Sequence, residues 1–382
     1  MASVSTLEAK VFQKIAEIPV GDWMSVFPDV LENYYLFKTL DESGFDQFTF
    51  SYIMIYDGAT PVAAAACFLM NFPLDITVQG VFKKVLDTIK MIWPGVLSPK
   101  VLMCGLPMGQ GRIGIAPDVE VKAVFSKLMR CLEGIAKEKK AMLINIKDLN
   151  IENVSKFDQS LRAHGFVKIE SLPSTDMQVA FPNFDEYLKT LSRVSRDGLK
   201  RKFKKVDGKV PISLEIVDTL DDAALSEVYP LYQQTLEKLD MGMERVPKAF
   251  FRQIAINMPQ QTKYFLWKIE GNVVAFTLCL FSEDTMIDYY LGFDYSVAYQ
   301  YHLYFVRFRD LMRWCIARKI KRYEMGVTTY EPKRRLGFNF IRLFFYMKHT
   351  NPLLNPFVGM VSFFLRPERF DPVFKELKKT AQ

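Results

Sequence analysis

The sequence predicts a mixed α/β (α+β) protein of two tandem domains, each a mixed sheet flanked by helices. Its 382 residues are about twice the length of a typical domain. A composition that is 49% hydrophobic and 14% aromatic excludes disorder for the bulk of the chain. The same order of predicted elements also occurs twice, which indicates a duplicated unit.

Each half is expected to contain a β-hairpin early in its sheet. Residues 50–69 hold two β-rich runs joined by a turn at Gly58, and residues 263–281 hold two such runs joined by Gly271 and Asn272. A strand, an amphipathic helix and a further strand follow each hairpin, at 100–105, 119–137 and 141–147 and again at 286–293, 302–318 and 322–327. Both halves then reach a Gly-Phe pair, at 165–166 and 337–338.

The first amphipathic helix carries apolar residues at helical spacing: Val121, Val124, Phe125, Leu128, Met129, Leu132 and Ile135. The repeated pattern breaks near residues 172–182, where Pro173 and Pro182 occur. We therefore expect an N-terminal domain at 1–175 and a C-terminal domain at 176–382.

No secretory signal, disulfide framework or metal site is expected. The N-terminus lacks a basic start followed by an apolar core. Five widely spaced cysteines indicate buried thiols in a reducing compartment, and none of the three histidines adjoins a cysteine. The charge-free stretches at 58–74 and 349–365 contain prolines and fall short of the roughly 20 apolar residues of a spanning helix. We predict a cytoplasmic protein without a transmembrane segment, whose second charge-free stretch is core or a homodimer surface.

Positive charge is concentrated in one segment. The formal net charge is +7, and residues 193–209 contain eight basic and two acidic residues. This excludes a general nucleic-acid-coating protein, so no DNA partner is expected. Arg193, Arg196, Lys200 and Lys204 form one stripe on the predicted helix. The stripe is either a solvated face or a docking surface for a polyanion, such as a tRNA acceptor arm, an acidic carrier protein, coenzyme A or anionic lipid.

Two further segments suggest chemistry. The loop of Gly109, Gln110, Gly111, Arg112 and Gly114 lies between a predicted strand and helix, where backbone N–H groups can bind phosphate. A plain flexible turn is the alternative for this loop.

Glu331 and Lys333 stand two residues apart, so in an extended segment both would point to one side. Such a pair can orient an amine or take its proton, and Arg335 can bind a carboxylate or phosphate. A solvated salt-bridged loop is the alternative here.

The order of hairpin, strand, long helix, strand and Gly-Phe resembles the GNAT acyltransferase fold, and its duplication resembles the FemAB-like branch of that superfamily. Three stretches carry the resemblance: 186–205 (EYLKTLSRVSRDGLKRKFKK), 288–294 (DYYLGFD) and 323–338 (YEMGVTTYEPKRRLGF). The resemblance covers roughly the whole chain, as pattern more than as identity.

The resemblance implies acyl transfer from an activated thioester or ester to a primary amine of a small molecule or peptide. Acyl-CoA or acyl-carrier protein would be the donor, with its phosphates at the Gly109–Gly114 loop and on Arg196, Lys200 and Arg335. Asp288 would be the base and Tyr330 the proton donor, with Tyr290 on the same side of its strand as Asp288. The matching loop of the second half, at 292–300, has no glycine cluster.

Two other readings remain open. One keeps the fold but uses aminoacyl-tRNA as the donor. The other is a catalytically silent binding protein that recognises its ligand between the domains.

Overall fold

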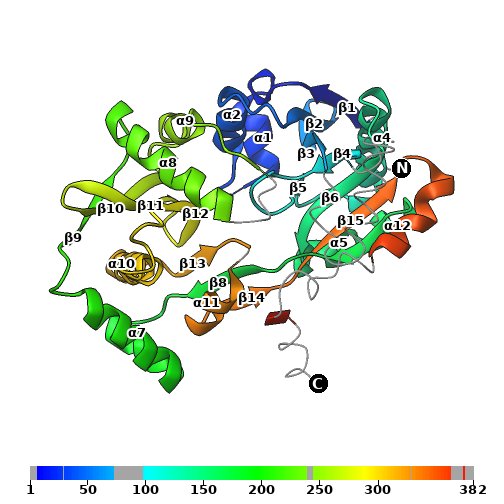
Figure 1. Ribbon diagram of the computed structural model, residues 1–382. Helices are drawn as coiled ribbons and strands as arrows, with labels where there is room; N and C mark the ends of the chain where they lie inside the picture. Colours follow the sequence, from blue (N-terminus) through cyan, green and yellow to red (C-terminus); the bar gives the residue numbers. More distant parts are fainter. Residues whose placement is uncertain are drawn as a thin grey trace, which may run out of the picture. The chain divides into compact units, whose positions relative to one another are not determined.

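The computed structural model describes residues 7–28, 30–72, 98–238, 244–327, 329–362 and 373–374. The chain forms two compact units (Figure 1). Unit 1 comprises Met1–Asp41, Phe45–Leu172 and Arg342–Gln382, and unit 2 comprises Glu42–Gly44 and Pro173–Ile341. Each described unit is built on one mixed sheet with helices packed against it, as the sequence predicted.

Unit 1 contains an eight-stranded sheet in the order β1-β2-β3-β4-β6-β15-β7, with β5 paired to β3. Its strands are β1 (Leu7–Phe12), β2 (Thr49–Asp57), β3 (Thr60–Asn71), β4 (Lys100–Cys104), β5 (Ile113–Ile115), β6 (Leu143–Asn150), β7 (Val167–Glu170) and β15 (Leu343–His349). Its helical segments are η1 (Ile15–Glu17), α1 (Val20–Val26), α2 (Tyr34–Glu42), α4 (Val121–Glu138), α5 (Ile151–Ala163), η4 (Pro352–Leu354) and α12 (Asn355–Ser362).

The core of unit 1 forms where α4 and α5 cover the sheet. The predicted apolar stripe of α4 is buried from Val124 to Ile135, and Val121 is half-buried at its start. Side chains of Ile53, Leu102 and Ile146 from the sheet belong to the same cluster. Periodicity alone therefore located the face of this helix that meets the sheet.

Unit 2 contains a seven-stranded sheet in the order β14-β8-β13-β12-β11-β10-β9. Its strands are β8 (Ser174–Gln178), β9 (Ile212–Val217), β10 (Thr262–Ile269), β11 (Asn272–Phe281), β12 (Thr285–Phe293), β13 (Arg322–Met325) and β14 (Asn339–Ile341). Its helices are α6 (Phe184–Thr190), α7 (Arg193–Val206), α8 (Asp222–Lys238), α9 (Phe250–Asn257), α10 (Leu303–Ala317) and α11 (Tyr330–Arg335).

The two sheets repeat one plan. The predicted hairpins are β2–β3 and β10–β11, and both are antiparallel. The next strand, β4 or β12, pairs antiparallel with the hairpin and parallel with the strand after the long helix, β6 or β13. The duplication expected from the sequence is therefore present in the strand pairing of both units.

The C-terminal segment departs from the predicted division. Residues from Arg342 onward, assigned above to the second domain, group with unit 1. The physical reason is β15, which pairs antiparallel with both β6 and β7 and so fills the place between them. Figure 1 shows β15 in orange running beside β6. Unit 2 is thus an insertion between two parts of unit 1.

Candidate functional site

In unit 2 two parallel strands separate. Strand β12 pairs with β11 as far as Phe293, but it pairs with β13 only from Thr285 to Asp288. Beyond Asp288, β12 continues while β13 ends at Met325. We call this point the fork. Among the described residues, no strand lies along the free edge of residues 289–292, whereas the Phe293 amide donates to Thr235 Oγ1 of α8 at 3.1 Å. A free edge of this kind can pair with an extended ligand.

A β-bulge lies directly at the fork. Leu278 is opposite Tyr290 and Cys279 is opposite Asp288, so Tyr289 is an extra residue in β12. A bulge interrupts the alternation of side chains along a strand. The prediction that Asp288 and Tyr290 share one side is therefore wrong. Asp288 meets Arg307 of α10, whereas the ring of Tyr290 packs against Tyr232, Phe250 and Phe251 of α8 and α9.

Asp288 is held by a buried polar cluster. Its Oδ2 accepts a hydrogen bond from Arg307 Nη1 at 2.5 Å and another from the Tyr323 hydroxyl at 3.0 Å. Arg307 Nη1 also donates to Thr277 Oγ1 at 3.0 Å. Burial, followed by the charge of Asp288, raises the pKa of Tyr323 well above its usual range. The cluster ties β12 to α10, β13 and β11 at the fork.

Lys333 holds the other strand of the fork. Its Nζ donates to the carbonyls of Met325, Gly326 and Val327 at 3.2, 2.8 and 3.3 Å. Thr175 Oγ1 of β8 also donates to the first two carbonyls. Burial lowers the pKa of Lys333 to about 7, against the charge of nearby Asp288. The ammonium therefore fixes the end of β13 where it leaves β12.

Residues 330–335 form helix α11, not the extended segment expected. Residues two apart on a helix do not share a side, so Glu331 and Lys333 point differently. Lys333 is buried, while Glu331 is half-buried and accepts from Arg334 at 2.8 Å and from Arg335 at 2.7 Å. These arginines lower the pKa of Glu331. The hydroxyl of buried Tyr330 donates to the Pro173 carbonyl at 2.9 Å.

The basic helix α7 begins at Ser192, whose side chain caps it, and packs Leu199, Phe203 and Val206 into unit 2. Lys200 and Lys204 line a hollow of about 390 Å³ together with Phe184, Leu188 and Arg313 among others. Arg196 donates to the Lys189 carbonyl at 3.5 Å. Both predicted cations, Arg196 and Lys200, thus lie toward α6.

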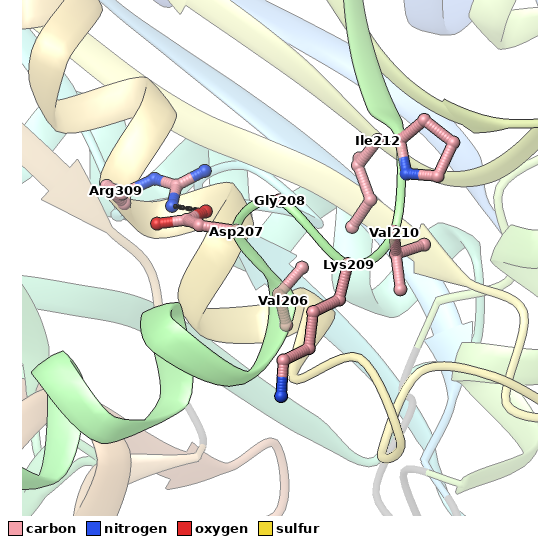
Figure 2. A pocket seen from close by; sticks show the side chains of 8 residues that line it. Val206, Asp207, Gly208, Lys209, Val210, Ile212 and Arg309 are labelled. Carbon is pink, nitrogen blue, oxygen red and sulfur yellow. Dashed lines mark hydrogen bonds and ion pairs between the residues drawn. The ribbon is translucent and has the colours of Figure 1, made fainter.

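A second hollow, of about 350 Å³, follows the C-terminal end of α7. Figure 2 shows its lining residues, including Val206, Gly208, Lys209 and Ile212. Asp207 and Arg309 form an ion pair of 2.7 Å at its edge, and the Lys209 side chain extends away from that pair.

The comparisons with known proteins identify the family. A model of the FemAB-like family, described as peptidoglycan biosynthesis/recognition, matches residues 98–367, which is more than half of the chain. The chain belongs to the FemAB-like family.

Solved structures show the same fold. A crystal structure of FemX is 14% identical with a TM-score of 0.56 and covers 88% of this chain and 96% of its own. A tandem GNAT protein from the clavulanic acid biosynthesis pathway is 10% identical with a TM-score of 0.53, covering 91% and 99%. The C-terminal domain of a putative lysylphosphatidylglycerol synthetase from Agrobacterium fabrum is 10% identical with a TM-score of 0.54, covering 91% and 96%. The predicted tandem GNAT fold is confirmed, and family and fold together support transferase activity.

One curated relative is a putative 8-amino-7-oxononanoate synthase 2 of Mycobacterium tuberculosis, 23% identical over 330 residues. The match covers 84% of this chain and 42% of the relative. The FemAB-like chain thus spans less than half the length of that protein.

In unit 1 of this FemAB-like chain, the glycine loop is packed into the protein. A Cβ on Gly111 would lie 1.4 Å from the Lys147 carbonyl oxygen, one on Gly109 2.3 Å from Glu32 Oε1, and one on Gly114 2.6 Å from the Val26 carbonyl oxygen. The Gly111 amide donates to the Asp148 carbonyl at 3.3 Å, and Gly114 lies in β5. Arg112 forms an ion pair of 3.2 Å with Glu32, and Gln110 is half-buried beside it. Close approach of the backbone explains these glycines without a phosphate.

The same loop fills the fork of unit 1. There β4 and β6 are parallel partners as far as Cys104 and Ile146. Lys147, which follows directly in β6, donates from Nζ to the carbonyls of Leu106, Pro107 and Gly109 at 2.8, 2.7 and 3.2 Å. The chain itself therefore fills the fork of unit 1, whereas none of the described residues forms a strand in the fork of unit 2.

The structure brings Asp288 and Lys333 close enough for their charges to interact, and Lys333 lies 5.7 Å from the centre of the Tyr330 ring. Sequence reasoning missed Arg307, Thr175 and Lys147. Arg307 had a visible signal, because it lies between Leu303 and Leu311 at four-residue steps, in the middle of the buried face of α10. A lone cation in such a face indicates a buried partner.

The described residues contain neither a membrane-spanning helix nor a cluster of metal ligands. None of the helices in that part of the chain is both long and apolar enough to cross a membrane. Within the same ranges, histidine, cysteine and acidic residues form no group that could hold a metal ion.

Proposed function

We propose that this FemAB-like chain is an N-acyltransferase that moves an acyl group from an acyl thioester, either acyl-coenzyme A or acyl-carrier protein, to a primary amine. The observation that carries the proposal is the fork of β12 and β13, with its free backbone edge at residues 289–292 among the described residues. The pantetheine arm of both donors carries amide groups. An extended arm can therefore pair with this edge as an added strand would.

The reaction needs few protein groups. The amine nitrogen attacks the thioester carbonyl carbon, a C–N bond forms, the C–S bond breaks, and the leaving thiolate takes up the proton that the nitrogen loses. Backbone N–H groups of the open edge are suited to stabilise the negative charge on the carbonyl oxygen. Unit 2 is the proposed donor-binding domain, because in unit 1 the glycine loop fills the corresponding fork between β4 and β6.

Four of the residues predicted to be catalytic receive a role in this proposal. Asp288 and Tyr330 are positioning residues, because their polar atoms bind Arg307 and the Pro173 carbonyl. Lys333 positions the end of β13 through its three carbonyl contacts. Glu331 is half-buried and ion-paired with Arg334 and Arg335, which lower its pKa, so it is ionised at neutral pH and positions these two arginines.

A transfer assay with three donors tests the function. The purified chain is incubated with acyl-coenzyme A, acyl-carrier protein or aminoacyl-tRNA and a panel of primary amines, and thiol release and amide mass are followed together. We expect thiol release in step with amide formation for a thioester donor. Failure of all three donors would reject the proposal and favour a silent binding protein.

Residue roles are tested by kinetics. Glu331→Gln is expected to change KM for the donor more than it changes kcat, because Arg334 and Arg335 lose the carboxylate that positions them. Lys333→Ala is expected to lower kcat by about tenfold or more through disorder at the fork. Full activity of both variants would show that α11 does not serve the reaction.

A second candidate is aminoacyl transfer from charged tRNA. It is favoured by the similarity to FemX, by the family description and by the cationic helix α7. The family description also makes a peptide amine a candidate acceptor. In the same assay, this candidate predicts release of uncharged tRNA, with a steep dependence on salt concentration, and no thiol release.

A further inference from the structure

The loop between β12 and α10 uses its own backbone donors. In glycine-rich phosphate loops at such positions, free amides face the ligand. Here the loop folds on itself through bonds from Val297 and Ala298 to the Asp294 carbonyl (3.2 and 2.9 Å), from Tyr301 to the Val297 carbonyl (3.0 Å) and from Leu303 to the Ala298 carbonyl (3.0 Å). The Ser296 amide donates to Asp294 Oδ1 at 2.9 Å. These amides are therefore not available to a donor phosphate at this position, whose charge nearby side chains can neutralise instead.

Such side chains surround the end of this loop. Lys202 Nζ of α7 lies 4.9 Å from the centre of the Phe305 ring, in the first turn of α10. Burial, and then the charges of Arg335, Arg201 and Lys205, lower the pKa of Lys202. Burial, Lys202 and Lys205 likewise lower the pKa of His302, the residue that ends the loop.

Two of these cations lack a carboxylate partner among the described residues. Lys202 and Lys205 make no ion pair with any residue in the described ranges. Arg335 pairs with Glu331, whose single carboxylate also binds Arg334. Like charges held together destabilise a fold, and an anionic ligand relieves that repulsion.

We propose that Lys202, Lys205 and Arg335 bind the phosphate of the donor's phosphopantetheine arm, replacing the backbone amides of a glycine-rich loop. The inference rests on the proposed function and names the residues that recognise the donor. Coenzyme A and a modified carrier protein share this phosphate, so the site serves either source. Lys200 and Lys204 lie on the other side of α7 and line the hollow beside α6, outside the proposed site.

The test is a binding measurement with coenzyme A and with pantetheine, which lacks the phosphate. Lys202→Ala/Lys205→Ala is expected to bind coenzyme A at least about tenfold more weakly, from the loss of charge-assisted hydrogen bonds, and to bind pantetheine unchanged. Its affinity for coenzyme A should also depend less on salt concentration. The charge-preserving Lys202→Arg/Lys205→Arg variant should retain binding, which guards against a folding defect.

Two matched pairs complete the design. Lys200→Ala/Lys204→Ala removes the same charge from the same helix and should weaken binding less than the Lys202/Lys205 pair. Lys209→Ala/Lys321→Ala removes two exposed lysines of unit 2 and should leave binding unchanged. If all three double-alanine variants lose the same affinity for coenzyme A, the effect comes from net charge alone, and the proposed site is wrong.

Separate binding measurements distinguish coenzyme A from a carrier protein as the source of the phosphate. Binding of modified but not of unmodified carrier protein, weakened by Lys202→Ala/Lys205→Ala, assigns the site to a carrier. Normal coenzyme A binding and normal transfer in that variant would overturn the site while leaving the proposed function intact. If the protein without substitutions binds charged tRNA but neither coenzyme A nor modified carrier protein, both the proposed site and the thioester donor are rejected.

Discussion

Arg307 in α10 donates from Nη1 to Oδ2 of Asp288 in β12 at 2.5 Å, and both side chains are buried. Removing one partner of a buried ion pair leaves an uncompensated charge, which costs more than the pair itself contributes. Arg307→Met should therefore lower the free energy of unfolding by about 3–5 kcal/mol. Urea denaturation measures the change.

The control is the double variant Arg307→Met/Asp288→Asn, which leaves neither charge in the core. It should be more stable than Arg307→Met alone. Additive losses in the two single variants would mean that Arg307 and Asp288 are not energetically coupled.

Lys333 should make stability depend on pH. Its pKa is lowered to about 7 in the folded chain by burial, from an ordinary value of 10.5. Between these two pH values the Lys333 side chain carries a proton in the unfolded chain but not in the folded chain. The free energy of unfolding therefore increases steadily as the pH is raised from 7 to 10.5. Relative to Lys333→Met, the unmodified chain should gain up to about 1.4 kcal/mol per pH unit between pH 7 and 10. Parallel stability curves for the two proteins would contradict a buried titrating lysine.

Gly111→Ala should destabilise unit 1 strongly, because its Cβ would lie 1.4 Å from the Lys147 carbonyl oxygen. A loss of about 3 kcal/mol is expected from overpacking against backbone. Gly134→Ala is the matched control, since Gly134 lies in α4 with nothing within 4 Å of an added Cβ. That variant should gain about 0.5–1 kcal/mol from helix propensity. Thermal and urea unfolding measure the stability of both variants, and equal stability of Gly111→Ala and Gly134→Ala would contradict the prediction.

Tyr290 and Tyr323 should respond differently to loss of the hydroxyl. The buried Tyr290 hydroxyl has no hydrogen-bond partner among the residues described, so Tyr290→Phe should be neutral or stabilising. Tyr323→Phe removes a bond to the charged Asp288 and should cost about 1.5–3 kcal/mol. Loss of acyl transfer in a stable Tyr290→Phe variant would instead assign that hydroxyl to the reaction.

The elements with local signals were predictable from the sequence. The hairpins β2–β3 and β10–β11 follow from β-rich runs joined by glycine turns, and the buried face of α4 follows from its period. The GNAT resemblance was correct because it rests on the order of these elements. Their order survives where identity to known structures is only 10–14%.

The details of the site depended on information that is not local. The extra residue Tyr289 is visible only once β11 is placed beside β12, and it reverses the predicted relation of Asp288 to Tyr290. Helix α11 carries a proline at its centre, which obscured it, and so Glu331 and Lys333 were assigned to one side. The glycine loop of unit 1 showed the right residues for phosphate but serves close packing.

The place of β15 sets an order of events during synthesis. Strands β6 and β7 leave the ribosome about 190 and about 170 residues before the strand that joins them, which at 5–20 residues per second is roughly 10 to 40 s. During that interval two strand edges of unit 1 lack their partner, and unpaired edges invite association with other chains. Unit 2 can complete its sheet first, since β8 to β14 precede β15 in the chain. Unit 2 can therefore fold before β15, the last strand of unit 1, has been synthesised.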